Sequence, residues 1–395
     1  MRIETLIVKN FKVFKDVEIK NIPDMAVFLG MNGVGKTTFF DVFGFLNDCL
    51  SKNVRTALAS RGGFAEVISR EQTGSIEFVI QFRQNVNDPL ITYELAICLD
   101  DISRQPIILK ETMRFRRGQT GQPWVVLKFS HGEGFAVSGE IKSYDDVKTV
   151  KKREKQRLDS PDILAIKGLG QFKEFVAIAS LRKLIEDWYV SDFHINDARQ
   201  RNNAGYNENL SKTGDNLANV AKFLFDNHRD VFNGILDKMR ERVPGVTSVE
   251  AGETQDGYIV LRFGDGKFKN PFSARFVSDG TIKMFAYLAL LSDPKPHTLL
   301  CVEEPENQLY PKFLPILAEE FRNYTKSGGQ VFVSTHSPDF LNAIELSELY
   351  CLVKKDGFTK IYKAADSSQV TALYKAGDLL GYLWNQELLL EEVSR

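Results

Sequence analysis

A glycine-rich segment near the N-terminus has the residue types and spacing of a phosphate-binding loop. Residues 30–38 read Gly-Met-Asn-Gly-Val-Gly-Lys-Thr-Thr and match the pattern G-x-x-x-x-G-K-S/T. In such a loop backbone N–H groups surround a β-phosphate, the lysine reaches the β- and γ-phosphates, and the hydroxyl binds Mg²⁺. We therefore expect ATP and Mg²⁺ as cofactors, with Lys36 on the phosphates and Thr37 on the metal ion. The expected nucleotide contacts are Asn32, Gly33, Val34, Gly35, Lys36, Thr37 and Thr38.

The neighbouring residues have the hydrophobic patterns that would position this loop. The apolar run 25–29 predicts a buried strand, and the spacing of apolar residues over 39–50 predicts a helix. A helix that starts directly after the loop adds a partial positive charge that attracts phosphate. Strand, loop and helix therefore occur in the order that this chemistry requires.

Two adjacent carboxylates end a second apolar strand. The apolar run that begins at residue 298 predicts a strand whose last residues are Glu303 and Glu304. A strand in a parallel sheet delivers its last side chains to the ligand crevice at its carboxyl edge. Because adjacent strand residues point to opposite sides, we expect Glu303 to reach the Mg²⁺ shell through water and Glu304 to orient or deprotonate the attacking water. Taken alone, these residues also fit a solvated acidic strand end.

A Ser-Asp-Gly sequence lies upstream of these carboxylates. Ser278 and Gly280 precede the helical pattern of residues 284–291. A helix N-terminus with a serine and a bare glycine suits a γ-phosphate, because unpaired amide groups converge there. Taken alone, Ser-Asp-Gly is also an ordinary N-cap and turn. Its place shortly before the acidic strand favours the phosphate-binding interpretation.

A histidine ends a further apolar strand. The apolar run that begins at residue 330 predicts a strand that ends in His336, with Ser334 and Thr335 before it. A neutral imidazole there could hydrogen-bond the γ-phosphate and respond to its loss. A lone histidine on a strand is more often an ordinary packed or surface residue. Its spacing after Glu304 favours a catalytic role for His336.

Together these motifs resemble those of ABC-class ATPases of the RecF, SMC and OLD-like branch. The Ser-Asp-Gly form looks like the signature of that branch, residues 3–14 look like its opening strand, and residues 306–311 resemble its D-loop. The resemblance covers roughly residues 1–50 and 270–345. Within this branch, the chain most resembles the compact AAA family ATPases that lack coiled-coil arms and a TOPRIM domain.

This resemblance implies a nucleotide-sandwich homodimer, or a higher oligomer built from it. The phosphate-binding loop and the paired carboxylates of one subunit would face Ser278 of the other across two Mg²⁺-ATP. One residue departs from the family pattern, and the position of another family residue stays open. Glu303 stands where the family usually has Asp, and its extra methylene could slow hydrolysis or change the Mg²⁺ geometry. The family's Q-loop glutamine could be Gln72, Gln81 or Gln171, so none belongs to the predicted site.

The predicted fold class is α/β, an ABC-type P-loop NTPase head with a mixed core sheet, an antiparallel sheet and a mainly helical inserted lobe. Residues 73–137 alternate in strand fashion and predict the antiparallel sheet, whereas 160–240 are mainly helical. The predicted domains are 1–140 as the N-terminal half of the head, 141–255 as the helical insertion, and 256–395 as the C-terminal half.

Composition limits the classes of partner. The chain has 395 residues, 43% of them hydrophobic, and a net charge of −1, so it has no overall electrostatic preference for nucleic acid. A basic run at 148–157 is by default a solvated helix or loop, and otherwise a phosphate-backbone contact for DNA or RNA. Four cysteines without metal-ligand spacing suggest reduced thiols, and the absence of a signal peptide or a long apolar stretch predicts a cytoplasmic protein without a membrane partner.

The function expected from the resemblance is ATP turnover coupled to DNA or to an effector protein such as a nuclease, in DNA repair or phage defence. The segment after His336 is too short for a TOPRIM nuclease domain, so we expect any cutting to belong to another chain. The alternative is a regulatory or scaffold module that ATP stabilises, with little turnover. A nucleotide subunit of a membrane transporter fits less well, because its signature normally has Gly-Gly.

Overall fold

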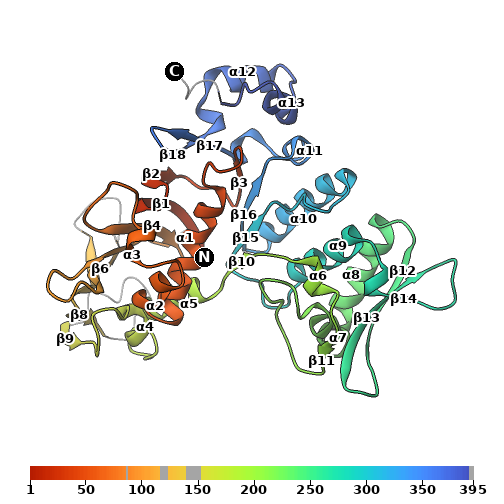
Figure 1. The fold of residues 1–395 in the computed structure, drawn as a ribbon, viewed down its shortest axis with the longest axis horizontal. Helices are drawn as coiled ribbons and strands as arrows, with labels where there is room; N and C mark the ends of the chain where they lie inside the picture. Colours follow the sequence, from red (N-terminus) through yellow and green to blue (C-terminus); the bar gives the residue numbers. More distant parts are fainter. Residues whose placement is uncertain (86–87, 116–122, 139–152, 391–395) are drawn as a thin grey trace. The chain divides into compact units, whose positions relative to one another are not determined.

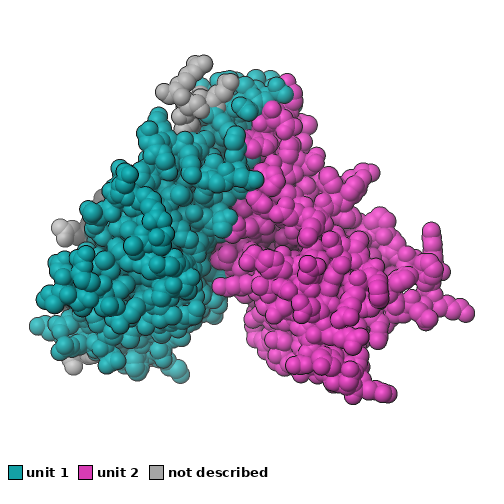
Figure 2. Space-filling model, in the orientation of Figure 1, with its two compact units in different colours: residues 1–188, 346–378, 386–395 teal, residues 189–345, 379–385 magenta. Residues whose placement is uncertain are grey.

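The computed structural model describes residues 1–85, 88–115, 123–138 and 153–390 (Figure 1). The chain divides into two compact units, coloured separately in Figure 2. Unit 1 contains residues 1–188, 346–378 and 386–395, and unit 2 contains residues 189–345 and 379–385. The predicted domain boundaries at 140 and 255 stay a prediction, and the compact units divide the chain at other positions.

Unit 1 contains an antiparallel sheet, and β4 (Ile76–Arg83) shows most clearly how its strands pack on an apolar core. On β4 every second residue is buried, as expected for a sheet with one face on an apolar core. The strand order is β2-β1-β4-β5-β6-β7-β8-β9. The other strands are β1 (Arg2–Phe11), β2 (Phe14–Lys20), β5 (Ile91–Leu99), β6 (Pro106–Phe115), β7 (Trp124–Ser130), β8 (Glu133–Val137) and β9 (Arg153–Arg157). The antiparallel sheet predicted for 73–137 is thereby confirmed.

A second group of strands in unit 1 supports the phosphate-binding loop. The buried strand β3 (Met25–Leu29) pairs in parallel with β17 (Leu349–Lys355), and β17 pairs antiparallel with β18 (Phe358–Lys363). The Phe28 ring lies 4.0 Å from the Phe39 ring of α1 (Lys36–Ser51) and 5.5 Å from the Tyr350 ring of β17, between ring centroids. This aromatic packing fixes the strand and the helix on either side of the loop.

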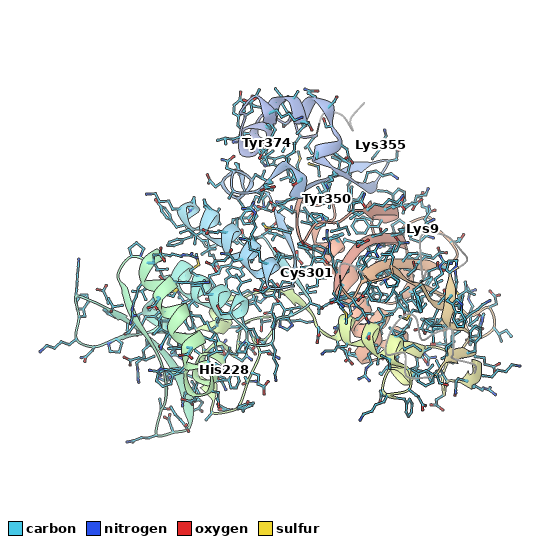
Figure 3. The ribbon with its side chains drawn as sticks, turned by 180° about the vertical axis from the view of Figure 1, so that it is seen from behind. Lys9, His228, Cys301, Tyr350, Lys355 and Tyr374 are labelled. Atoms are coloured by element: carbon cyan, nitrogen blue, oxygen red, sulfur yellow. The ribbon has the colours of Figure 1, made fainter. Side chains whose placement is uncertain are left out.

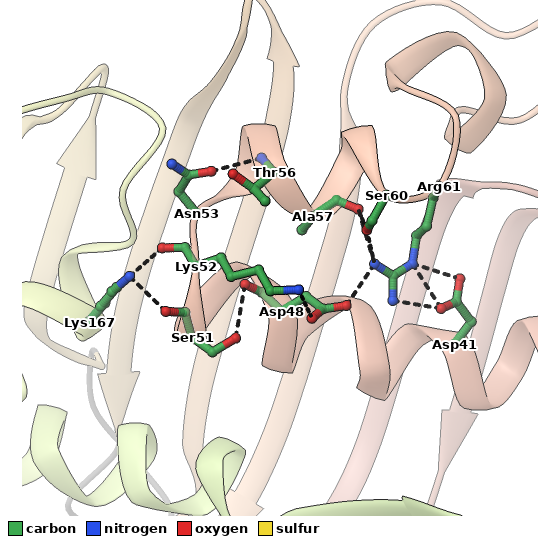
Figure 4. Close-up of polar contacts among 10 residues, drawn as sticks. All are labelled: Asp41, Asp48, Ser51, Lys52, Asn53, Thr56, Ala57, Ser60, Arg61 and Lys167. Carbon is green, nitrogen blue, oxygen red and sulfur yellow. Dashed lines mark hydrogen bonds and ion pairs between the residues drawn. The ribbon is translucent and has the colours of Figure 1, made fainter. Parts of the chain in front are cut away.

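Short helices complete unit 1. They are α2 (Val54–Ala59), α3 (Phe64–Val67), α4 (Ala165–Leu169), α5 (Val176–Glu186) and α12 (Ser368–Lys375), with single turns η4 (Leu346–Glu348) and η5 (Ala364–Asp366). Arg61, just after α2, ties this region to α1 (Figure 4). Its guanidinium bonds Asp41 and Asp48 of α1 at 2.8 and 2.9 Å, and it also donates to the Ala57 carbonyl. Burial opposes ionisation of Asp41, but its bonds to Arg61 and Lys12 outweigh burial and lower its pKa.

A buried carboxyl, Glu111 on β6, caps the start of α4. Its oxygens accept from Ala165 N at 2.6 Å, from Ile166 N at 3.0 Å and from the Tyr93 hydroxyl at 3.1 Å. Burial raises the pKa of Glu111 to about 7, although these three bonds oppose the shift. The folded protein therefore holds a proton on Glu111 at a pH where the unfolded chain has lost it.

This predicts a pH dependence of stability. Between the ordinary pKa of 4.5 and the folded value of about 7, the unfolding free energy should fall as pH rises. The expected slope is about 1.4 kcal/mol per pH unit. Above the folded pKa, the unfolding free energy that Glu111 contributes at pH 4.5 is lost completely. Urea unfolding of wild type and Glu111→Gln at several pH values measures the difference, because the amide does not titrate. Parallel pH profiles for the two proteins would contradict the assignment.

Unit 2 consists of a parallel strand pair, a small antiparallel sheet and helices. The strands β15 (Leu299–Glu303) and β16 (Gln330–Thr335) are parallel, with Glu303 opposite Ser334. The chain enters through β10 (Trp188–Ser191), which neighbours β15. The antiparallel sheet contains β11 (Asn202–Asn203), β12 (Val246–Glu253), β13 (Tyr258–Asp265) and β14 (Phe272–Ser273).

The helices of unit 2 are α6 (Ile195–Ala198), α7 (Leu217–Asn227), α8 (Arg229–Arg242), α9 (Asp279–Leu291), α10 (Leu314–Lys326), α11 (Pro338–Leu341) and α13 (Leu380–Asn385), with single turns η2 (Ala274–Phe276) and η3 (Pro311–Phe313). Residues 160–240, predicted to be mainly helical, hold α4 and α5 in unit 1 and α6, α7 and α8 in unit 2, together with the short strands β10 and β11. On α10 the buried Glu320 carboxylate pairs with Lys238 and Arg242 of α8. These ion pairs join two helices far apart in the sequence.

The default interpretation of the basic run is wrong in its secondary structure where the structure describes it, although the basic side chains described there are solvated. Residues 153–157 form strand β9 instead of a helix or loop, because they pair with β8 at the edge of the antiparallel sheet. Lys155 and Arg157 are exposed there, and Arg157 makes an exposed ion pair with Glu133 at 3.3 Å. Lys148, Lys151 and Lys152 lie outside the described residues.

The cysteines are unpaired, and most are buried. Cys301 lies within β15 and is labelled in Figure 3. Burial raises the pKa of Cys351 to about 12 and also raises that of Cys49 and Cys301. Cys98 is partly exposed, and burial again raises its pKa. The protonated thiols are poor nucleophiles and metal ligands, which agrees with a structural role.

Candidate nucleotide-binding site

The glycine-rich loop of unit 1 adopts a backbone that requires two of its glycines. It links the buried end of β3 to the first residue of α1, Lys36. Gly33 and Gly35 have φ of 78° and 109°, in the left-handed region that side chains disfavour. A Cβ on Gly35 would also lie 2.8 Å from Thr359 Oγ1 and 2.9 Å from Val13 Cγ2. Only glycine fits this position without a shift of its neighbours.

A threonine on a distant strand holds the loop from behind. Thr359 of β18 is 1% exposed, and its hydroxyl donates to the Val34 carbonyl at 2.6 Å. Its backbone N–H also donates to the Val13 carbonyl at 2.9 Å. Sequence reasoning missed Thr359, because nothing in its local pattern marks it as a partner of a loop so far away in the chain.

Lys36 lies inside the loop, whereas the residues that would meet phosphate are open to solvent. Its Nζ donates to the Gly30 carbonyl at 2.8 Å and to the Met31 carbonyl at 3.3 Å. Lys36 is 6% exposed. Asn32, Gly33 and Thr37 are exposed, and Val34, Gly35 and Thr38 are partly exposed. The seven predicted nucleotide contacts therefore form one continuous loop and helix start around a buried ammonium group.

In unit 2, the chain turns sharply where β15 ends. Glu304 has a φ of 40°, an uncommon value for a residue with a side chain. Its backbone N–H donates to the Ser334 carbonyl at 3.0 Å, which holds the turn against β16. Such a conformation costs on the order of 1–3 kcal/mol and is over-represented at functional sites. Glu303, the residue before it, is the last residue of β15 and is partly exposed.

The turn brings Glu304 and His336 together. His336 Nδ1 lies 3.3 Å from Glu304 Oε1 and 3.5 Å from Glu306 Oε1. An ionised carboxylate only accepts hydrogen bonds, so a hydrogen bond to either of these carboxylates would use a proton on Nδ1. The other ring nitrogen, Nε2, then remains for a ligand. A neutral ring would accept a hydrogen bond there from water, whereas a γ-phosphate contact requires the doubly protonated ring.

Glu306 supports this arrangement, although the sequence interpretation gave it no role. Its Oε1 accepts from the Thr335 hydroxyl at 2.7 Å and from the His336 N–H at 2.9 Å. Its Oε2 is buried without a hydrogen-bond partner among the described residues. Glu306 thus fixes the backbone on which His336 sits. The sequence signal for it was present, since it lies two residues after Glu304 and starts the D-loop-like segment.

The Ser-Asp-Gly sequence forms the start of α9 in unit 2. Ser278 is the N-cap, and its Oγ accepts from Thr281 N at 3.3 Å. Arg199 donates to the Val277 carbonyl and pairs with Asp279, so it holds the residues on both sides of Ser278. The ordinary N-cap interpretation and the phosphate-binding interpretation are thus both compatible with the geometry.

The structure brings some predicted site residues together and leaves others in separate units. Glu304 and His336 meet within unit 2, which also carries Ser278, Gly280 and Glu303, whereas the phosphate-binding loop belongs to unit 1. Their roles in catalysis and binding stay predictions. The candidates for the Q-loop lie on β4 (Gln81), in the turn before it (Gln72) and after α4 (Gln171), so the choice among them stays open.

Comparison with known proteins identifies the family. A family model described as an AAA domain, putative AbiEii toxin, Type IV TA system, matches residues 25–342. The chain belongs to this family. The match takes in the loop, Ser278, the paired carboxylates and His336. The assignment to ABC-class ATPases of the RecF, SMC and OLD-like branch is confirmed, and the family and fold are those of ATPase-type P-loop NTPases.

A curated relative and two solved structures are similar to this chain. The Old nuclease of Escherichia phage P2 is 22% identical over 409 residues, which cover 95% of this chain and 63% of that protein. The chain therefore spans less than two thirds of the length of this relative. An SMC head bound to the C-winged helix domain of ScpA has a TM-score of 0.57 at 14% identity, covering 92% of this chain and 97% of that chain.

The second structure is an SMC head domain with an extended coiled coil, bound to the C-terminal domain of ScpA derived from Pyrococcus furiosus. It has a TM-score of 0.52 at 13% identity and covers 95% of this chain and 99% of that chain. Both structures show that the fold is that of an ABC-type head, as the sequence predicted. Among the described residues, no helix combines the length and apolar character needed to cross a membrane.

Proposed function

We propose that this chain binds and hydrolyses ATP in a head-to-tail dimer and couples turnover to DNA or to an effector protein. The observation that carries the proposal is the pairing of Glu304 with His336 at the strand ends of unit 2, in a chain that also has a complete phosphate-binding loop. A carboxylate and an imidazole in contact can position water and manage its proton.

The loop residues fit the nucleotide phosphates by their own chemistry. The left-handed backbone at Gly33 and Gly35 leaves the loop amides without side chains over them, and Lys36 supplies a point charge. Thr37 and Glu303 have the hard oxygen atoms that Mg²⁺ prefers, so they would be its protein ligands. When bound, the ion would neutralise charge that develops on the transferred phosphoryl group.

Glu304 would orient or deprotonate the attacking water. Its Oε2 accepts from Asn307 Nδ2 at 3.1 Å, and its Oε1 faces His336, so both oxygens have fixed neighbours. His336 would sense the water or the γ-phosphate through Nε2. Ser278 of the partner subunit would complete the site at its α9 N-terminus, because its amide groups suit a γ-phosphate.

The similar proteins and the cysteines support a partner and a compartment for this chain. The relative named Old nuclease supports coupling to a nuclease effector or to DNA, in DNA repair or phage defence. The SMC heads bound to ScpA support a protein partner on a head of this fold. The unpaired, mostly buried cysteines support a reducing compartment such as the cytoplasm.

A second function is an ATP-stabilised scaffold that holds an effector and turns over little ATP. The observation that favours it is Glu303, which stands in place of the family's usual Asp and carries a longer side chain. Phosphate release by wild type, measured with and without DNA while the oligomer mass is followed, separates the two. We expect turnover and an ATP-dependent dimer. ATP binding without turnover under any condition would establish the scaffold, and absence of ATP binding would contradict both.

A further inference from the structure

The start of α9 lies against the turn that follows Glu304 within unit 2. A Cβ on Gly280 would be only 3.4 Å from the Gln308 carbonyl oxygen, so the first turn of the helix nearly touches this backbone. One turn later, Lys283 Nζ donates to the Asn307 carbonyl at 2.6 Å. The helix that carries Ser278 is therefore bonded directly to the D-loop-like segment.

Lys283 is an unusual residue for this contact. It is 4% exposed, and lysine is almost never so buried without a partner. Burial lowers its pKa to about 8, although the charges of Glu306 and Glu304 oppose this shift. The Tyr287 ring also lies 5.7 Å from Nζ. A buried cation beside two carboxylates gives a strong and well-placed bond to the Asn307 carbonyl.

Asn307 continues the connection from its side chain. Its carbonyl accepts from Lys283, and its Nδ2 donates to Glu304 Oε2 at 3.1 Å. His336 Nδ1 stands 3.3 Å from the other oxygen of the same carboxylate. The rotation of the Glu304 carboxylate is thus set on one side by Asn307, whose backbone is in turn set by α9.

We propose that Lys283 and Asn307 are positioning residues that transmit the position of the α9 N-terminus to the Glu304 carboxylate. This inference rests on the proposed function. In a head-to-tail dimer, Ser278 contacts the nucleotide held by the partner, whereas Glu304 acts on the nucleotide held by its own subunit. The Lys283 and Asn307 bonds then couple the two nucleotide sites, so that occupation of one aligns the catalytic carboxylate of the other.

The test is a double-mutant cycle with Lys283→Met, Asn307→Ala and the double variant. Each single change should lower kcat by about 10- to 100-fold, the cost of a carboxylate displaced by about 1 Å. ATP affinity should stay within about twofold, because the phosphate-binding loop is untouched. The double variant should resemble the single variants, since both changes break one path. The Hill coefficient for ATP should fall toward one in all three.

A matched pair elsewhere on unit 2 provides the control. Lys326 and Asn323 on α10 form an exposed lysine–asparagine contact at 3.2 Å. Lys326→Met and Asn323→Ala should leave kcat and the Hill coefficient unchanged. If Lys283→Met does not fold, Asn307→Ala carries the test, because Asn307 is exposed and its loss should leave Tm unchanged.

Three outcomes overturn the inference. An unchanged kcat in Asn307→Ala would show that Asn307 does not position Glu304. Multiplicative losses in the double variant would show that Lys283 acts independently of Asn307. An unchanged Hill coefficient would show that Lys283 and Asn307 do not couple the two nucleotide sites. All three leave the proposed function in place when wild type turns over ATP, whereas a wild type without turnover overturns the proposed function and this inference together.

Discussion

Replacing Glu304 by glutamine is expected to stop ATP turnover while nucleotide binding persists. The amide keeps the shape of the side chain but cannot take a proton from the attacking water. Loss of a general base costs about 10²- to 10⁴-fold in rate. Because the loop of unit 1 is unchanged, ATP should still bind and should hold the Glu304→Gln protein as a dimer. Phosphate release and sedimentation of the same sample measure both properties.

The control for this variant is Glu319→Gln, an exposed carboxylate on α10 of the same unit. It removes the same charge outside the turn after β15 and should turn over ATP at the wild-type rate. Turnover by Glu304→Gln at the wild-type rate would show that another group activates the water. A Glu304→Gln protein that hydrolyses nothing and also fails to bind ATP would point to a folding defect, which thermal unfolding would reveal.

Replacing Lys36 by alanine is expected to abolish tight ATP binding. The Lys36 ammonium is the buried cation of the loop, and each bond from it to a phosphate is worth about 1.5–3 kcal/mol. Its loss should weaken the ATP affinity by about 100-fold, which corresponds to roughly 3 kcal/mol. Titration of a fluorescent ATP analogue measures this change in the affinity.

Lys52→Ala serves as its control. Lys52 is the C-cap of the same helix and makes an exposed ion pair with Asp48 at 3.3 Å, so it is a lysine on α1 far along the helix from the loop. Its loss should leave ATP affinity within about twofold, because surface ion pairs contribute little. Equal ATP affinities for Lys36→Ala and wild type would contradict the phosphate-binding assignment.

Local patterns predicted the elements around the site closely. The apolar run 25–29 is β3, and the helix expected over 39–50 lies within α1. The strand expected to end in Glu303 and Glu304 is β15, but it ends at Glu303, because Glu304 takes a positive φ and turns the chain. These elements follow from the local pattern of apolar residues and from the glycines that end strands and helices, and both can be read from the sequence. The same holds for Ser278, whose N-cap chemistry is local.

The supporting residues could not be predicted, because tertiary contacts select them. Thr359 holds the loop from a strand more than 300 positions away, and Lys283 reaches Asn307 only because α9 packs on the turn after Glu304. The basic run was misjudged for a related reason. Residues 153–157 have no strand-like alternation of apolar residues, and pairing with β8 outweighs their weak local preference.

The central claim is that each nucleotide site is built from two subunits, and subunit mixing tests it most directly. Lys36→Ala and Ser278→Arg should each be inactive alone, because every site of either homodimer carries a lesion. In a mixed dimer, the loop of the Ser278→Arg subunit meets the intact Ser278 of the Lys36→Ala subunit. We therefore predict that mixing the two inactive proteins restores ATP turnover at the one intact site, at a rate well below that of wild type because the second site stays empty and cannot align Glu304. A mixture that forms mixed dimers and stays inactive, or a Ser278→Arg protein that is fully active alone, would contradict the account.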